Sequence, residues 1–206
     1  MTRYTLARPF LLAVAASVVA LSGCATISSA PRSSAAVASY RDSVDLAGRI
    51  AINYSRDGKK ESLNGKFTWQ QTKSNTDVSL ISPTGQTVAI INVTPASATL
   101  KESGKAPRTA PDLDTLTQQT LGWTLPVSGL RDWLQGYAVD SEGKRFVASP
   151  ANDNVVTRDG WKLEYMSWQD DNASVPQPKR IDVTRIALGQ AVDDMAIRIV
   201  IDPAAQ

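Results

Sequence analysis

Apolar and polar residues alternate along much of the chain, and this alternation restricts the fold more than any other feature of the sequence. In residues 48–54, Ile50, Ile52 and Tyr54 fall on one face of an extended chain, because successive side chains of a strand point to opposite faces. The same period occurs in residues 65–71, 77–82, 161–165, 179–184 and 195–201. The chain is therefore expected to be mainly β, built from strands with one apolar face.

Turn-forming residues separate these segments. The sequences SRDGKK, SPTG, ESGK and SEGK begin at residues 55, 82, 102 and 141, and each combines glycine with polar residues. Their spacing predicts hairpins of an antiparallel sandwich or barrel. Residues 87–93, TVAIINV, are apolar on both faces, so we expect a cover on the outer face of this strand or a filling on its inner face.

Two segments in the middle of the chain have helical spacing instead. In the first, Leu113, Leu116 and Leu121 share one helix face, with Thr109 expected as the N-cap and Gly122 as the end. The second, VSGLRDWLQG, has its apolar residues on one stripe and also ends in glycine. Two short helices inserted into a strand-rich domain are expected to cover one open end or one face of a curved sheet.

The amino end has the order of a secretory signal. Residues 1–23 contain two arginines and no acidic residue, then an apolar run over residues 10–21 that is short for a membrane span, then two small residues. Cys24 is the only cysteine of the chain, so it cannot form a disulfide within it, and a free exported thiol would be a liability. The remaining interpretations of Cys24 are a disulfide to another molecule or a chemical modification.

The four residues that end at Cys24, LSGC, resemble the bacterial lipobox. The resemblance implies a lipoprotein signal peptide over residues 1–23, removed just before Cys24, which then carries the lipid anchor. By the sorting rule of enteric bacteria, Ala25 rather than an aspartate points to the outer membrane, facing the periplasm. The alternative is an ordinary signal peptide with a chance cysteine near its end.

Removal of the signal changes the charge of the chain. The full sequence has 22 basic and 20 acidic residues; without Arg3 and Arg8 the count becomes 20 against 20, so the mature chain is formally neutral. An interaction with nucleic acid therefore loses its main support. Residues 24–39 are rich in serine and alanine and are expected to be a lipid-anchored flexible tether, and residues 40–206 are expected to be one domain.

Four sequence pieces together resemble the LolB family of outer-membrane lipoprotein receptors. They are FTWQQ at 67–71, SPTG at 82–85, LPVSGLRDWLQG at 125–136 and WKLEY at 161–165, in this order behind a lipobox. The resemblance implies an incomplete antiparallel β-barrel, that is a curved sheet, enclosing a hydrophobic cavity under a helical lid. It also implies a monomer that takes lipoproteins from a periplasmic carrier of the LolA type by binding their acyl chains, such as palmitate, and inserts them into outer-membrane lipid without a cofactor.

The alternating apolar residues supply candidates for the wall of this cavity. Each of them fits an ordinary packed core as well, and only the resemblance turns the set into a cavity. The candidates are Ile50, Ile52, Phe67, Trp69, Val78, Leu80, Trp123, Leu130, Trp133, Leu163, Ile197 and Ile199.

The loop SPTG departs from the family pattern. In the family this loop presents a large apolar residue, usually leucine, that helps to push cargo into the membrane. Pro83, Thr84 and Gly85 occupy the corresponding membrane-insertion loop here, and Thr84 takes the place of the apolar residue. Either another group performs this role, or insertion is less efficient, or Thr84 is only a turn residue.

Other classes of function have weaker support. The chain has no histidine, no G-x-S-x-G elbow and no phosphate-binding loop, so we do not expect an enzyme. The acidic pairs at 170–171 and 193–194 fit solvated turns, so no metal site is expected. A structural or assembly lipoprotein of the outer membrane, without acyl transfer, is the main alternative. A soluble carrier of the same pathway should lack Cys24.

Overall fold

The computed structural model describes residues 32–56, 58–121, 126–186 and 195–204, which belong to one compact unit that begins at residue 31. Twelve strands and two helices lie in these ranges. In chain order they are β1 (Val44–Arg56), β2 (Lys59–Gln71), β3 (Thr76–Ile81), β4 (Thr87–Val93), β5 (Ala98–Glu102), β6 (Arg108–Ala110), α1 (Leu113–Leu121), α2 (Val127–Trp133), β7 (Tyr137–Val139), β8 (Arg145–Val147), β9 (Asn154–Val156), β10 (Trp161–Trp168), β11 (Pro178–Arg185) and β12 (Met195–Ile201).

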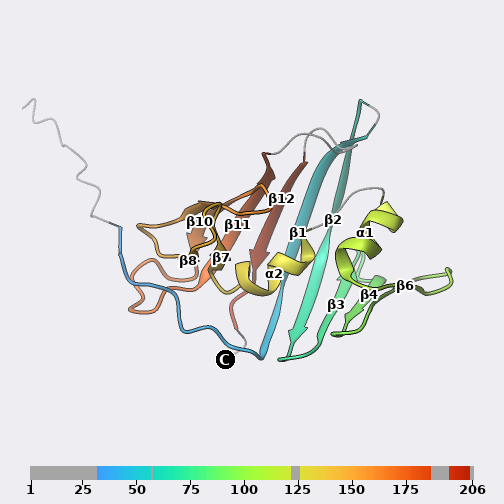
Figure 1. Ribbon diagram of the computed structural model, residues 1–206, viewed down its shortest axis with the longest axis horizontal. Coiled ribbons are helices and arrows are strands. Elements are labelled where there is room, and N and C mark those ends of the chain that lie inside the picture. The colour runs from blue at the N-terminus through green and yellow to red at the C-terminus, as the bar shows by residue number, and fades with distance from the viewer. Residues whose placement is uncertain (1–31, 57, 122–125, 187–194, 205–206) are drawn as a thin grey trace, which may run out of the picture. The chain divides into compact units, whose positions relative to one another are not determined.

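Ten of these strands form one antiparallel sheet in the order β6-β5-β4-β3-β2-β1-β12-β11-β10-β9. The two outermost strands, β6 and β9, are not paired with each other, so the sheet stays unclosed. β7 and β8 form a separate hairpin. Figure 1 shows the curved sheet with α1 and α2 on the same side of it. The sequence-based expectation of a mainly β, incomplete barrel with two short helices is confirmed.

The alternating apolar residues lie on one face of the sheet. The register places Ile52 opposite Ile197, and Phe67 opposite Leu80, so that apolar side chains of neighbouring strands meet in rows. Along β12, buried and exposed or half-buried positions alternate without interruption. A shift of one residue in any of these strands would turn its apolar set to the outer face, so burial fixes the register.

The four predicted hairpin turns are all present, between β1 and β2, β3 and β4, β5 and β6, and β7 and β8. In the turn that joins β3 and β4, the Gly85 amide donates to the Ser82 carbonyl at 2.9 Å. Gly85 has a φ of 89°, a conformation that side chains disfavour, which is why glycine ends the SPTG sequence.

Helix α1 begins later than the sequence pattern predicted. Thr109 was expected to be its N-cap, but this residue belongs to β6, where its hydroxyl lies 3.1 Å from that of Thr99. Asp112 caps the helix instead, because its carboxylate accepts hydrogen bonds from the amide and the hydroxyl of Thr115 at 2.7 and 2.9 Å. These bonds lower the pKa of Asp112.

The residues before β1 pack against the domain. The Val37 amide donates to the Ala148 carbonyl at 3.1 Å, and the Tyr137 hydroxyl donates to the Ala38 carbonyl at 2.7 Å. Val37 is buried, and it lies so close to Gly136 that a Cβ there would come within 2.8 Å of it. The packed unit therefore begins before residue 40, where the sequence placed the end of the tether.

The doubly apolar strand β4 has a register irregularity. Leu80 pairs with Ala89 and Ile81 with Thr87, so Val88 is an extra residue, as in a β-bulge. Further along the strand, Ile91 is buried on the inner face and Ile90 is 42 % exposed. The inner face of β4 is thus the covered one, while Ile90 remains open to solvent.

Candidate functional site

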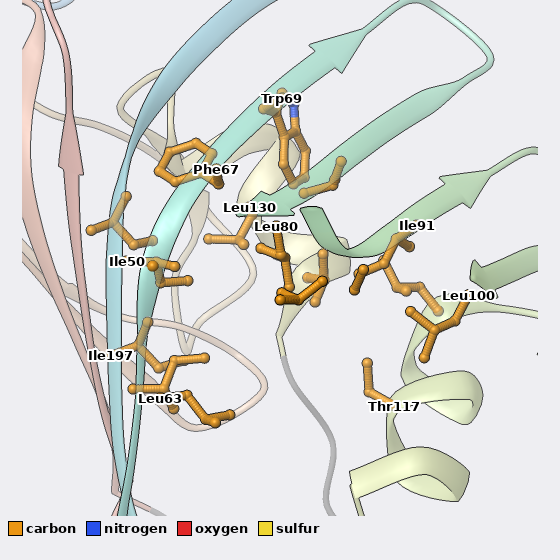
Figure 2. A pocket seen from close by; sticks show the side chains of 18 of the residues that line it. Ile50, Leu63, Phe67, Trp69, Leu80, Ile91, Leu100, Thr117, Leu130 and Ile197 are labelled. Atoms are coloured by element: carbon orange, nitrogen blue, oxygen red, sulfur yellow. The ribbon is translucent and has the colours of Figure 1, made fainter. Parts of the chain in front are cut away.

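A cavity of about 340 Å³ lies between the concave face of the sheet and the two helices. Its size is at the lower end of the range for small-molecule sites, and nearly all of its wall is apolar. In Figure 2, side chains of β1, β2 and β12 face those of β5 and α1 across this space. The wall consists of Ile50, Ile52, Leu63, Asn64, Gly65, Lys66, Phe67, Trp69, Val78, Leu80, Ile81, Val88, Ala89, Ile91, Leu100, Glu102, Leu113, Leu116, Thr117, Thr120, Pro126, Val127, Leu130, Leu134, Ile197 and Ile199.

The structure brings most of the sequence-derived candidates together in this wall. They are Ile50, Ile52, Phe67, Trp69, Val78, Leu80, Leu130, Ile197 and Ile199. Trp133 and Leu163 do not line the cavity but belong to the buried core. Trp123 and Cys24 lie outside the described residues. Contact of any of these residues with an acyl chain stays a prediction.

Trp133 and Leu163 lie in a part of the core that is rich in packed aromatic rings. The Tyr165 ring stacks between those of Phe146 and Trp168, with centroids 6.2 and 5.9 Å apart. The Tyr165 hydroxyl donates to the Trp133 carbonyl at 3.1 Å, and burial raises the pKa of this phenol. Leu163 is fully buried in the same region.

Several wall residues were not among the sequence-derived candidates. Leu113 and Leu116 come from α1, whose helical spacing was recognised without being assigned to the cavity. Ile91 and Leu100 come from β4 and β5, and their alternation carries the same signal as that of the other strands. Val88 lines the cavity next to the irregularity in β4, which no periodic pattern reveals.

Arg131 connects α2 to the end of the sheet at which β2 turns into β3. Its guanidinium donates to the Thr76 hydroxyl at 2.7 Å and to the Thr72 carbonyl at 2.8 Å, both beside the turn that joins β2 and β3. Thr76 is buried, so the arginine satisfies an oxygen that water reaches poorly. This contact holds the covering helix at one end of the cavity.

A second polar contact joins the two helices. The Ser128 hydroxyl of α2 donates to Asp114 Oδ2 of α1 at 3.2 Å. Asp114 Oδ1 is buried and has no hydrogen-bond partner within the described ranges. Burial raises the pKa of Asp114, and the negative charge of Asp112 adds to this effect, while the bond from Ser128 opposes it. The helices are therefore linked through a carboxylate in an unfavourable environment.

The cavity opens where β2 continues beyond the end of β3. β2 pairs with β1 over its whole length, but with β3 only from Lys66 onward. Leu63 lines the cavity there and is 46 % exposed, and Val88, on the other side, is 45 % exposed. Wall residues that solvent reaches to this extent mark the mouth.

Charged side chains lie beside this mouth. Lys66 is exposed, and Glu102 is half-buried and forms ion pairs with Lys105, at 2.9 Å, and with Arg108. The hydrogen bond from Lys105 lowers the pKa of Glu102, and Arg108 lowers it further. Glu102 therefore remains ionised at neutral pH. The polar side chains of the wall are those of Asn64, Lys66 and Glu102 and the threonines of α1.

The loop that contains Pro83, Thr84 and Gly85 connects β3 and β4 and is exposed. The Thr84 hydroxyl lies 2.9 Å from that of Ser82, and the Gln86 amide donates to the same Ser82 hydroxyl at 3.2 Å. The loop ends at Gln86, two residues before the wall residue Val88, and so lies next to the mouth. Its role in insertion is a prediction.

An unclosed antiparallel sheet with an apolar cavity under two helices defines a class of β proteins built to enclose an apolar group. The family model described as outer membrane lipoprotein LolB matches residues 42–203. The chain belongs to this family and is an outer-membrane lipoprotein.

Three relatives align with this chain over most of their length, and each is named outer-membrane lipoprotein LolB. That of Cupriavidus metallidurans is 41 % identical over 162 residues, which cover 76 % of this chain and 78 % of the relative. That of Cupriavidus necator is 39 % identical over 162 residues, with coverages of 78 % and 80 %. That of Cupriavidus taiwanensis is 37 % identical over 188 residues, with coverages of 89 % and 90 %.

Among solved structures, a LolA superfamily protein from Nitrosomonas europaea aligns with a TM-score of 0.44 at 10 % identity, covering 79 % of this chain and 84 % of that one. This likeness is too low to support an inference. Within the described residues, no helix is both long and apolar enough to cross a membrane.

Proposed function

We propose that this chain, an outer-membrane lipoprotein receptor of the LolB family, holds the acyl chains of incoming lipoproteins in the cavity under α1 and α2. The observation that carries the proposal is the cavity itself, about 340 Å³ of space walled by aliphatic and aromatic side chains from six strands and two helices. The receptor would accept its cargo from a carrier of the LolA type, act as a monomer and release the cargo into outer-membrane lipid. It requires no cofactor and no nucleic acid.

The free energy of an acyl chain explains why such a wall suits transfer. Exposing one sixteen-carbon chain to water costs on the order of 10 kcal/mol, so a chain that moves between proteins and membrane needs continuous cover. An apolar wall gives this cover without directional bonds, and it therefore accepts chains of different length. Because the wall has few polar groups, it adds no strong directional bonds to the acyl chain. The chain can therefore bind the cavity more weakly than it partitions into a bilayer, and this difference drives release.

A charge placed on the wall tests this proposal. Leu80→Glu puts a carboxylate against the cavity and should lower both the binding of a fluorescent fatty acid and the uptake of a labelled lipoprotein from the carrier by at least tenfold. The matched control is Ser79→Glu, which adds the same charge to the adjacent position of β3, a residue that does not line the cavity. Circular dichroism checks that both variants are folded.

Equal binding by the two variants and the wild type would show that the cavity does not bind the acyl chains. The alternative would then be favoured, namely a structural or assembly lipoprotein of the outer membrane.

The anchor is a separate part of the proposal. LSGC at residues 21–24 resembles a lipobox, and membership of an outer-membrane lipoprotein family supports lipidation at Cys24 after removal of residues 1–23. Because the thioether needs sulfur, Cys24→Ala should leave an uncleaved precursor without fatty acid. Mass spectrometry of the mature amino end checks this, and an unacylated end at another residue would contradict it.

We also propose that the loop of residues 83–85 faces the bilayer during release. It is exposed beside the mouth of the cavity, which is the support for this placement. Thr84→Leu should then speed transfer from receptor to liposomes and leave uptake from the carrier unchanged, whereas Thr84→Glu should slow release. Equal release rates for the three chains would show that the loop is only a turn.

A further inference from the structure

We infer that the mouth of the cavity is a docking surface for anionic phospholipid, with lysines as its contact groups and Leu63 and Val88 as its apolar centre. The inference rests on the proposed function, because it names the surface onto which the cavity empties. It differs from the loop proposal in the residues and in the chemistry involved, since Thr84 carries no charge and little apolar surface.

The first observation is where the charge lies. Residues 55–66, which span the β1–β2 hairpin, and residues 101–108, which span the β5–β6 hairpin, contain seven basic and three acidic residues, a net charge of +4. The mature chain as a whole is neutral if residues 1–23 are removed. The positive charge is thus concentrated in two hairpins, and both contribute residues to the mouth, Lys66 from one and Glu102 from the other.

The second observation is that these cations are available to an outside partner. Lys59, Lys60, Lys66 and Lys101 are exposed, and none of them takes part in an ion pair within the described ranges. The acidic Glu102, in contrast, is already bound by Lys105 and Arg108. Available lysines on the two hairpins that contribute to the opening attract a negatively charged surface.

The third observation is that two exposed apolar residues line the same mouth. Leu63 and Val88 are each nearly half exposed and also line the cavity, so an apolar path leads from the wall to the surface. Exposed apolar side chains on the same strand as exposed lysines, such as Leu63 on β2, are the pattern of surfaces that lie in a membrane interface. The residues before Lys66 follow β2 past the end of β3, and Figure 1 shows this hairpin projecting at the top of the view.

Lysines on β2 have a second explanation that the experiment must separate. The part of β2 from Lys59 to Gly65 has no β3 partner, and charged residues on such an edge prevent aggregation. Glutamate protects an edge as well as lysine does, but it repels anionic lipid. Charge reversal therefore separates the two roles, whereas removal of the charge would not.

The test measures binding of the chain without its signal and anchor cysteine, residues 25–206, to vesicles by flotation. One set of vesicles is phosphatidylcholine alone, and the other is phosphatidylcholine with an equal amount of phosphatidylglycerol. The wild type should bind the anionic vesicles much more tightly, and added salt should weaken this binding. Lys59→Glu with Lys60→Glu should reduce it roughly 25-fold or more, because each lysine near an anionic surface contributes about fivefold.

The matched control is Lys73→Glu with Lys179→Glu. These exposed lysines lie in the β2–β3 turn and near the start of β11, at the opposite end of the strands, and the charge change is the same. The control should bind like the wild type. Val88→Ser should weaken binding to both kinds of vesicle, since it removes apolar contact but no charge.

Three results would overturn the inference: no binding to anionic vesicles, equal binding to both vesicle types, or equal weakening by the two double variants. If vesicles are not bound but Lys59→Glu with Lys60→Glu abolishes uptake from the carrier, the surface belongs to the carrier instead. Fatty-acid binding in the absence of vesicles is measured in parallel. If the wild type binds no fatty acid, the proposed cavity function is refuted. If it binds fatty acid but no vesicles, only the docking surface is refuted.

Discussion

The concave face of the sheet has two halves that follow the same strand pattern but differ in what covers them. In the filled half, β10 and β11 present Leu163, Ile181 and Val183, all fully buried, beneath the aromatic residues of β8, β10 and α2. In the hollow half, β2 to β5 present Trp69, Leu80 and residues of the same type to the cavity beneath α1. Alternation thus builds a wall, and the opposing element decides whether the wall becomes core or cavity.

The opposing elements differ in size and polarity. The α2 to β8 segment brings Trp133, Tyr137 and Phe146 against the filled half. Helix α1 brings Thr117 and Thr120 into the cavity wall beside its two leucines, and the Thr120 hydroxyl is buried without a hydrogen-bond partner within the described part of the chain. Small, partly polar side chains cannot fill the space that large aromatic rings fill on the other side.

Truncation of one leucine in each half should show the difference between the two halves most clearly. Leu163→Ala removes contacts in a close-packed core and should lower the free energy of unfolding by about 2 to 5 kcal/mol. Leu80→Ala enlarges a space that already exists, so the loss should be about 1 kcal/mol. Urea unfolding followed by tryptophan fluorescence measures both.

Equal losses for the two variants would mean that the hollow half is packed in solution as tightly as the filled half. A bound fatty acid should stabilise the Leu80→Ala protein against urea, because its cavity persists.

Arg131 should have the next largest effect, because α2 borders both halves. Arg131→Met keeps the aliphatic stem but leaves the Thr76 hydroxyl and the Thr72 carbonyl without this donor, so the free energy of unfolding should fall by about 1 to 3 kcal/mol. Arg131→Lys should lie between, since an ammonium does not reproduce the planar fork of donors. If Arg131→Met is as stable as the wild type, α2 is held by its apolar contacts alone.

Asp114 should give a smaller, pH-dependent effect. Its pKa is raised by burial, so the folded chain binds this proton more tightly than the unfolded chain does, and the related stability is present below the ordinary pKa of 3.8 and lost as the pH rises through the raised value. Asp114→Asn should therefore raise the melting temperature at pH 7, and the gain should disappear near pH 3.

Asp112 is the control for this measurement, because its pKa is lowered by the amide of Thr115. Its stabilising contribution is present above its ordinary pKa and lost as the pH falls, so Asp112→Asn should lower the melting temperature at pH 7. A shift of the same sign in both variants would argue for a general charge effect on α1.

The sequence was sufficient to predict a mainly β fold, because the alternation in residues such as Ile50, Ile52 and Ile197 fits strands with one apolar face. Alternation alone left a sandwich and a barrel open, and the incomplete barrel was implied by the family resemblance. The hairpin turns followed from their glycines. The cap of α1 was misplaced, since Thr109 also suits a strand, and its pairing with Thr99 depends on a partner ten residues away. Local patterns do not contain that information.

The candidate site was predictable in part for the same reason. Alternation identified the inner face, but Leu163 and Leu80 look alike in sequence, and only the packing of Phe146 and Tyr165 separates core from cavity. The mouth was not predictable, because it depends on the different lengths of pairing along β2 and on the extra residue Val88.

The unequal pairing of β2 also has a consequence for the cargo that the proposed function would allow. The mouth lies where β2 runs past the end of β3, and Leu63 and Val88 border it from two different strands, so under the proposed function an acyl chain would enter directly from the surface. A tunnel would require the attached polypeptide to be threaded through it or to fit at its entrance. If the mouth admits the acyl chain from the surface, as proposed, the folded part of a lipoprotein would stay outside, and transfer would be independent of the size and shape of the protein that the lipid carries.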